Sequence, residues 1–344
     1  MMFDINNLVR ENVKKLTPYS CARDEYEGKE GIFMDANENP FGNLNRYPDP
    51  YQKKLKASIS RLKGIPVENV FLGNGSDEII DLCFRIFCKP GIDKVLTFSP
   101  TYGMYEVSAA INDIHPIKIP LNKNFHIEIG SVTPWLKDPN VKLIFICSPN
   151  NPTGNSMKNS DIEFIITHFS GIVVIDEAYN DFSAKPSFIS LIDYYPNLIV
   201  MQTFSKAFGL AAVRVGMAFT NSCTIQYFNK MKPPYNISTI NQMAALRKLL
   251  CIEKVKKQVC NIKIQRDKLA ANLKKLTIIE NVYPSDANFL LVKTKNADYI
   301  YSKLVENKII VRNRSKIVPG CIRITVGTKS ENDKLIQILK RITL

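Results

Sequence analysis

The clearest chemical signal in this chain is a lysine, Lys206, that follows the hydroxyl residues Thr203 and Ser205 and precedes an arginine, Arg214. Apolar residues flank this lysine, so its amine is expected to be partly buried. Burial beside another cation lowers the pKa of a lysine, and the neutral amine can form a Schiff base with a carbonyl group. The two hydroxyls and the guanidinium can bind a phosphate group. The segment therefore indicates covalent binding of a phosphorylated aldehyde, although a Ser-Lys pair alone more often marks an ordinary surface lysine.

The second segment, residues 173–179, is an apolar run that ends in acidic and aromatic side chains. Such a run is typical of a buried parallel strand, and α/β sheets bind their ligands at the carboxyl ends of these strands. Asp176 can there keep a pyridine nitrogen protonated, which makes the ring a better electron sink, while Tyr179 can donate to a phenolate oxygen. A helix that begins with Asp176 as its cap is the alternative.

The third segment, residues 143–154, is an apolar run that leads into a turn of proline, asparagine and glycine residues. The run again predicts a buried strand. At its end, Asn151 directly precedes Pro152 and is placed to bond the same phenolate oxygen. A simple turn is the alternative.

The fourth segment, residues 69–80, predicts a short strand, a glycine turn and the start of a helix. Glycines let the backbone approach an anion closely, and the free N–H groups of a helix start bind phosphate. We therefore expect Gly75, Ser76 and Asp77 at a phosphate site, with ordinary helix capping by these residues as the alternative.

In this order, the four segments resemble the fold-type I aminotransferases, which use pyridoxal 5′-phosphate. Within that family the chain is most similar to the histidinol-phosphate aminotransferases, on motifs spread over nearly its whole length: residues 16–20, 34–40, 45–49, 99–105 and 321–327. The resemblance implies a ping-pong enzyme of histidine biosynthesis that converts L-histidinol phosphate and 2-oxoglutarate to imidazole-acetol phosphate and L-glutamate. It also implies a homodimer.

The resemblance assigns roles to individual residues. It implies Lys206 as the Schiff-base lysine and proton shuttle, Asp176 at the pyridine nitrogen, and Asn151 with Tyr179 at the phenolate oxygen. Tyr102 would stack on the cofactor ring, and Tyr47 would reach the phosphate of the neighbouring subunit's cofactor. The phosphate of the chain's own cofactor would be surrounded by Gly75, Ser76, Asp77, Thr203, Ser205 and Arg214.

Arg323 matches the family arginine that takes the substrate's anionic group. Tyr19, Asn37 and Arg312 are implied as further substrate contacts, and the segment between Arg314 and Cys321 is short. A guanidinium pairs bidentately with a phosphate or with a carboxylate, so an arginine site accepts both histidinol phosphate and glutamate.

Other functions of the same fold stay open at this point. A threonine-phosphate decarboxylase shares the fold, the cofactor and the main motifs, and an aromatic amino acid aminotransferase would also suit an anion site with stacking aromatics. Transcription regulators with an aminotransferase-like domain need an added DNA-binding domain, and the motifs here begin at residue 16.

The amino-acid composition argues against several other classes of protein. The formal net charge is +14, but the lysines are scattered in pairs, which indicates a solvated surface and not a nucleic-acid or membrane partner. Eight cysteines without CxxC spacing indicate reduced thiols, and three isolated histidines give little basis for a metal site. Without a signal sequence or an apolar run of about 18 residues, a cytoplasmic protein is expected.

The spacing of apolar runs predicts an α/β fold with a mostly parallel, seven-stranded sheet and helices on both faces, followed by a smaller α+β unit. A large cofactor-binding domain is expected over residues 46–238, and residues 1–45 and 239–344 would form an N-terminal arm and a small domain. In the second part we expect a long helical region, 240–276, and short strands near Phe289, Ile310 and Ile322.

Overall fold

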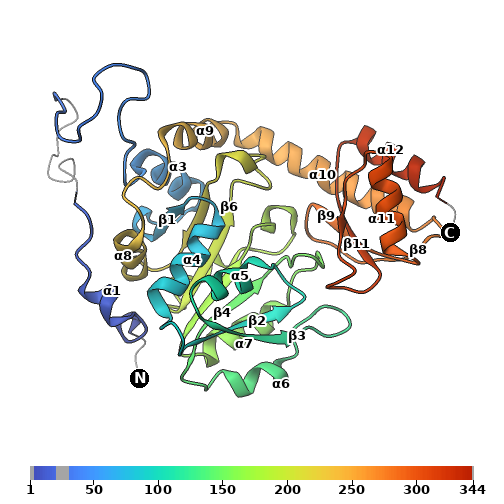
Figure 1. Ribbon diagram of the computed structural model, residues 1–344, viewed down its shortest axis with the longest axis horizontal. Coiled ribbons are helices and arrows are strands. Elements are labelled where there is room, and N and C mark those ends of the chain that lie inside the picture. The colour runs from blue at the N-terminus through green and yellow to red at the C-terminus, as the bar shows by residue number, and fades with distance from the viewer. Residues whose placement is uncertain (1–3, 21–30, 343–344) are drawn as a thin grey trace.

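The computed structural model describes residues 4–20 and 31–342, in which two β-sheets organise the chain (Figure 1). The larger sheet has the strand order β1-β7-β6-β5-β4-β2-β3. Its strands are β1 (Val70–Gly73), β2 (Lys94–Ser99), β3 (His115–Pro120), β4 (Val141–Cys147), β5 (Ile172–Asp176), β6 (Leu198–Thr203) and β7 (Gly216–Phe219). Strands β2 to β6 pair in parallel, whereas β7 is antiparallel to both β1 and β6. The expected mostly parallel, seven-stranded sheet is confirmed.

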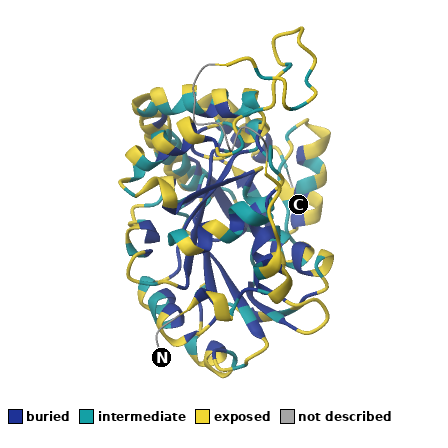
Figure 2. Ribbon diagram, turned by 90° about the vertical axis from the view of Figure 1, so that its left-hand side faces the viewer, coloured by how far each residue is buried: buried dark blue, intermediate teal, exposed yellow. Residues whose placement is uncertain are grey.

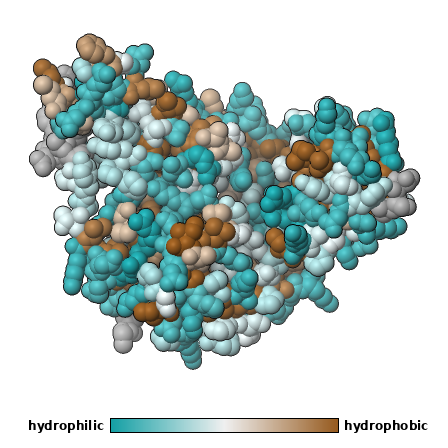
Figure 3. Space-filling model, viewed as in Figure 1, coloured by the Kyte–Doolittle hydropathy of each residue, from teal (hydrophilic) through white to brown (hydrophobic). Residues whose placement is uncertain are grey.

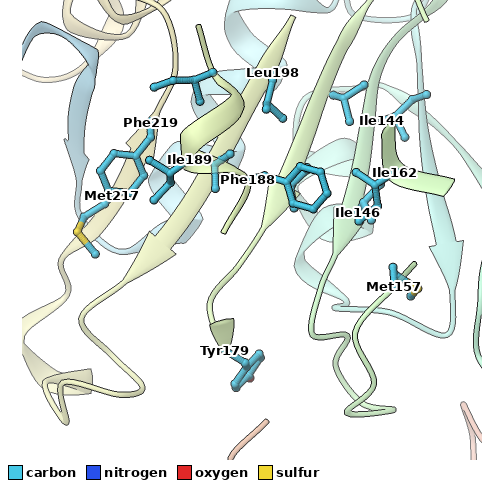
Figure 4. Packing of buried hydrophobic residues seen from close by; sticks show 14 of the residues in the cluster. Ile144, Ile146, Met157, Ile162, Tyr179, Phe188, Ile189, Leu198, Met217 and Phe219 are labelled. Atoms are coloured by element: carbon cyan, nitrogen blue, oxygen red, sulfur yellow. The ribbon is translucent and has the colours of Figure 1, made fainter. Parts of the chain in front are cut away.

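Helices cover both faces of this sheet, so its strands are buried on both sides (Figure 2). In β5, Ile172 and Val174 pack into a core that includes helix α4, while Val173 and Ile175 pack into a second core that includes α7. Figure 4 shows part of the second core, with Tyr179 beyond the strand ends. The helices of this part of the chain are α1 (Glu11–Lys15), α3 (Lys53–Lys63), α4 (Ser76–Phe87), α5 (Met104–Ile111), α6 (Ile129–Val132), α7 (Asn159–His168) and α8 (Ser222–Met231).

The smaller sheet is antiparallel, with the order β10-β11-β9-β8, and lies at the far end of the long helix α10 (Figure 1). Helices α10 and α11 contact β9, and α12 packs against both of these helices. The elements are α9 (Thr239–Leu250), α10 (Ile252–Leu273), β8 (Ile279–Val282), β9 (Phe289–Thr294), α11 (Ala297–Glu306), β10 (Arg312–Asn313), β11 (Cys321–Thr325) and α12 (Lys329–Leu339).

The sequence-based expectations for this second part need three corrections. The helical region over 240–276 is two helices, α9 and α10, which meet at Cys251. The strand expected near Ile310 begins at Arg312, and β8 was not expected at all. Only Val282 is buried in β8, so the strand carries almost no apolar signal in the sequence.

Two further properties concern the described residues as a whole. Across residues 4–20 and 31–342, no helix has the length and apolar character needed to cross a membrane. The seven cysteines in these ranges are free thiols, four of them buried, while Cys21 lies outside the described residues.

A buried asparagine closes the amino-terminal edge of the large sheet. The Asn197 side-chain amide donates to the carbonyls of Ile166 and Phe169, both at 3.0 Å, and is 3.3 Å from that of Gly171. These carbonyls run from the last turn of α7 to the residue before β5, so one side chain bonds the polar backbone of this connection. An unsatisfied buried carbonyl costs about 1–3 kcal/mol.

We predict that Asn197→Ala lowers the free energy of unfolding by about 2–3 kcal/mol, because it removes these donors and leaves buried carbonyls without partners. The urea midpoint of unfolding measures the change. Asn140→Ala, at an exposed turn, is the control and is expected to stay within about 0.5 kcal/mol of wild type. Equal midpoints for both variants would contradict this role for Asn197.

Candidate active site

Three neighbouring strands, β4, β5 and β6, end at one cavity of about 430 Å³. Their last residues, Cys147, Asp176 and Thr203, all line it. Parallel strands bring their carboxyl ends to one edge of a sheet, which explains why segments far apart in the sequence meet here. Twelve residues singled out from the sequence line this cavity: Ser76, Asp77, Tyr102, Asn151, Asp176, Tyr179, Thr203, Ser205, Lys206, Arg214, Arg312 and Arg323.

Asp176 is a buried carboxylate at the base of the cavity, with 3% of its surface exposed. Its Oδ2 accepts a 2.6 Å hydrogen bond from the Tyr105 hydroxyl, and its Oδ1 accepts one of 3.0 Å from the backbone N–H of Ala178. Burial raises the pKa of Asp176, while these two hydrogen bonds oppose the rise. A carboxylate that is desolvated in this way favours a cationic partner in the cavity.

Lys206 lies in the loop after β6, and its side chain is open to the cavity. Phe204 and Phe208, two positions before and after this lysine in the sequence, have buried rings that pack against each other and anchor the loop to the core. The Nζ atom is 5.5 Å from the centre of the Tyr179 ring. Partial desolvation lowers the pKa of Lys206, the nearby Arg323 lowers it further, and Asp176 acts in the opposite direction.

Small polar groups and the start of a helix surround one end of the cavity. Ser76 and Asp77 open helix α4, whose first N–H groups are free to bind an anion. The Thr203 hydroxyl donates to Ser205 Oγ at 3.0 Å, so the two hydroxyls lie together. Asp77 accepts hydrogen bonds from both the Tyr102 hydroxyl and Arg214 Nη2, each at 3.1 Å. This arrangement can hold a phosphate group.

At this end of the cavity, the turn at Gly75 lies very close to the segment from Arg214 to Gly216. Arg214 adopts a left-handed conformation (φ 52°), and its carbonyl accepts a 3.0 Å hydrogen bond from the N–H of Gly75. A Cβ atom on Gly75 would lie 2.5 Å from Arg214 Nη2, and one on Gly216 would lie 2.5 Å from the carbonyl carbon of Gly75. Gly216 has no room for a side chain against this backbone, and Gly75 has a positive φ of 76° that L side chains rarely adopt, so both positions favour glycine.

At the other end of the cavity, residues from the two sheets contact each other. Arg323, on β11 of the smaller sheet, donates from Nη1 to Oδ1 of Asn151, in the loop after β4. Its guanidinium carbon lies 5.2 Å from the centre of the Phe289 ring, and Tyr179 packs edge-on against the same ring. Since Oδ1 of Asn151 is occupied by Arg323, the amide N–H groups are left to donate into the cavity.

The structure distinguishes the two adjacent asparagines of the loop. Asn151 lines the cavity, whereas Asn150 is fully buried behind it. The Asn150 amide donates to Pro100 O and Thr153 Oγ1, and its carbonyl oxygen accepts from the Thr101 hydroxyl. Asn150 therefore supports the loop, and Asn151 is the one that can contact a ligand.

Three of the expected site residues lie elsewhere in this chain. Tyr19 is 71% exposed, and neither it nor Asn37 or Tyr47 lines the cavity. Asn37 and Tyr47 instead line a second cavity of about 450 Å³ beside residues 238–240. The roles given to these three residues stay predictions.

Four residues that shape the site had not been expected from the sequence. Cys147 and Arg314 line the cavity, Tyr105 bonds Asp176, and Phe289 supports Arg323. Arg314 lies two positions after Arg312, the spacing that brings two residues to one face of a strand, and this spacing was the signal that could have revealed it.

Comparison with known proteins gives the chain relatives over nearly its whole length. The family model "Aminotransferase class I and II" matches residues 12–339. The chain is 50% identical to the histidinol-phosphate aminotransferase of Cytophaga hutchinsonii, over 99% of both chains.

Solved structures agree with this comparison. The histidinol-phosphate aminotransferase of Clostridium acetobutylicum is 25% identical, with a TM-score of 0.80 over 87% of this chain and 90% of that one. The Sinorhizobium meliloti enzyme of the same name, solved in complex with pyridoxal-5′-phosphate, is also 25% identical, with a TM-score of 0.77 over 89% of each chain. The chain therefore belongs to the class I and II aminotransferase family, because its sequence, its fold and the residues gathered at its strand ends all match it.

Proposed function

We propose that this chain is a histidinol-phosphate aminotransferase that uses pyridoxal 5′-phosphate and exchanges an amino group between L-histidinol phosphate and 2-oxoglutarate. The observation that carries the proposal is the convergence on one cavity of Lys206, the buried Asp176 and an arginine-rich wall from the smaller sheet. Relatives of the same name, 46–50% identical over nearly the full chain, support the choice of substrate.

The residues present fit the cofactor. The desolvated carboxylate of Asp176 suits the protonated ring nitrogen, and the glycine cradle of Gly75 and Gly216 leaves the start of α4 open to the phosphate. Thr203, Ser205 and Arg214 complete the phosphate site, and the amide of Asn151 with the hydroxyl of Tyr179 can donate to the ring's oxygen. When bound, the cofactor supplies an electron-withdrawing ring that stabilises negative charge on the substrate's α-carbon.

Lys206 does the proton chemistry in this proposal. Only a neutral amine accepts a proton, and the pKa of Lys206 is lowered by partial burial and by Arg323. Its Nζ would take the proton from the α-carbon of the donor and return it to the cofactor side, and the second half-reaction would run in reverse. Tyr179, beside Nζ, limits where the amine can move.

Arg323 binds the anionic group of the substrate in this proposal. Its side chain is held by Asn151 and by the face of Phe289, so the guanidinium is fixed in direction before a ligand arrives. A guanidinium forms two parallel hydrogen bonds with either a carboxylate or a phosphate, which lets one site serve both substrates of the reaction. Arg312 faces the same cavity.

A homodimer in which Tyr47 serves the neighbouring subunit's site is part of the proposal. Residues 31–47 extend away from the large sheet and carry the exposed apolar side chains of Ile32, Met34 and Phe41. Figure 3 shows hydrophobic atoms on the surface at the upper left, the corner in which this segment lies in Figure 1. Glu38 organises this segment, because its carboxylate pairs with Arg46 at 2.7 Å and accepts the N–H of Tyr47 at 2.6 Å. An exposed apolar segment of this kind suits a protein interface. The free buried thiols favour a reducing compartment, and we propose the cytoplasm.

The function is tested by the substrate preference of the purified protein with pyridoxal phosphate and glutamate. We expect imidazole-acetol phosphate to be a better amino acceptor than phenylpyruvate, without release of carbon dioxide. Lys206→Ala is expected to lower turnover by at least about 10³-fold, because it removes the proton-transferring amine. Lys123→Ala, on an exposed loop, is the control. Preference for phenylpyruvate, or wild-type turnover of the Lys206 variant, would overturn the proposal.

The pH dependence of Lys206 follows from its neighbours. Removing the positive charge of Arg323 makes the protonated amine less unfavourable, so Arg323→Gln is expected to raise the pKa of Lys206. Less amine is then neutral at a given pH, and the pH of half-maximal reactivity moves upward. The rate at which cofactor-free enzyme binds pyridoxal, measured from pH 6 to 10, reports this midpoint. Arg247→Gln, on the exposed side of α9, should leave it unchanged, and a downward shift in the Arg323 variant would refute the coupling.

The dimer is tested by mixing two inactive variants, Lys206→Ala and Tyr47→Ala, after unfolding and refolding them together. A mixed dimer combines the intact lysine of one chain with the intact tyrosine of the other at a single site. Random pairing makes half the dimers mixed, so about a quarter of the sites should regain full function. If Tyr47 serves its own subunit, the mixture will show no gain over the two variants measured apart.

A further inference from the structure

Three arginines share one face of the hairpin formed by β10 and β11. Arg312 and Arg323 are directly opposite each other in the register of these strands. Arg314 follows Arg312 by two positions, and its N–H donates to the carbonyl of Cys321 at 2.9 Å, which continues the pairing past the end of β10. All three side chains line the cavity.

These positive charges are not balanced by acidic side chains. Within residues 4–20 and 31–342, none of the three guanidiniums forms an ion pair, and the side-chain hydrogen bond from Arg323 goes to the neutral amide of Asn151. Like charges placed opposite each other on a sheet destabilise it. The pKa of Arg314 is lowered by desolvation first, and then by the charges of Arg323 and Arg312. The hairpin therefore has a strong electrostatic preference for an anion.

The backbone at Arg314 is held in place by a hydrogen-bonded turn. Its carbonyl accepts the N–H groups of both Ile317 and Val318 at 2.8 Å, and the Asn313 side chain caps the turn through the N–H of Ser315. The Nε atom of Arg314 is buried, and no acceptor for it exists among the described residues. A buried donor without an acceptor costs stability. Since this atom is closed to solvent, a ligand in the cavity would meet the other nitrogens of the guanidinium, and Arg314 keeps its place in the cavity wall despite this cost.

The charge of the ligand group decides what a third arginine adds. A carboxylate carries one negative charge and two oxygens, which a single guanidinium already satisfies bidentately. A phosphate monoester carries about −1.5 to −2 charges at pH 7 and has three terminal oxygens. A guanidinium beyond Arg323 therefore stabilises a phosphate ester far more than a carboxylate.

We propose that Arg314 is a specificity-determining residue, which selects the dianionic phosphate ester of the amino donor over a carboxylate at the same site. The inference rests on the proposed function and deepens it. Arg323 binds either anion, whereas Arg314 supplies the charge and the additional donors that only the phosphate uses.

The test compares the two half-reactions of the holoenzyme in single-turnover experiments, with L-histidinol phosphate and with L-glutamate as donors. Arg314→Gln is expected to lower the rate constant per unit concentration about 10- to 100-fold for histidinol phosphate and less than about fivefold for glutamate. Arg314→Lys, which keeps the charge but not the planar fork, should fall between. Lys316→Gln removes a charge from the exposed side of the same turn and serves as the control, with both rates unchanged.

A pH series gives a readout that a merely structural role would not change. The second ionisation of a phosphate monoester has a pKa of about 6. The wild-type preference for histidinol phosphate over glutamate should therefore weaken between pH 7.5 and 5.5, and this dependence should flatten in Arg314→Gln.

The outcomes separate the two proposals. Equal losses in both half-reactions, an unchanged pH dependence, or the same effect in Lys316→Gln would overturn the role of Arg314 and leave the enzyme's function intact. A wild-type protein that reacts with neither donor would overturn the proposed function itself.

Discussion

The burial of one carboxylate, that of Asp176, is the constraint on which the rest of the site depends. Its position at the last residue of β5 leaves it with only 3% of its surface exposed, at the edge of the cavity. A charge in such a place is tolerated when hydrogen bonds and an opposite charge compensate for the lost water. Tyr105 and the N–H of Ala178 supply the first kind of compensation, and the cofactor's ring nitrogen suits the second.

The remaining charges of the cavity are arranged around that carboxylate. At one end, Asp77 holds Arg214 and Tyr102, so side chains of the proposed phosphate site are fixed by a carboxylate that is itself at the start of α4. At the other end, the arginines of the β10–β11 hairpin have no acidic partner among the described residues. Lys206 lies between the two groups, where partial burial and Arg323 favour its neutral form. In the proposed function, the smaller sheet thus supplies recognition of the substrate's charge, and the larger sheet supplies the cofactor site.

Much of this arrangement followed from local sequence signals. The apolar runs before Asn151 and Asp176 predicted strands, and the parallel sheet then placed their ends together. Strand alternation also explains why Asp176 and not its neighbour enters the cavity, since Glu177 turns to the other side and bonds the N–H of Phe188. The resemblance to a known family supplied the individual roles.

What the sequence did not reveal depends on contacts between distant segments. Tyr105 meets Asp176 across 71 positions, and the face of Phe289 supports Arg323 only once β9 and β11 have paired. The break between α9 and α10 at Cys251 has no proline or glycine to mark it. The role proposed for Tyr47 depends on a second subunit, which a single chain does not contain.

The central claim is that Lys206 is the residue that holds the cofactor. Reduction of the enzyme with borohydride in the presence of pyridoxal phosphate, followed by peptide mass analysis, tests it directly. We expect one pyridoxyl group, on Lys206. A group on any other lysine, with Lys206 unmodified, would contradict it.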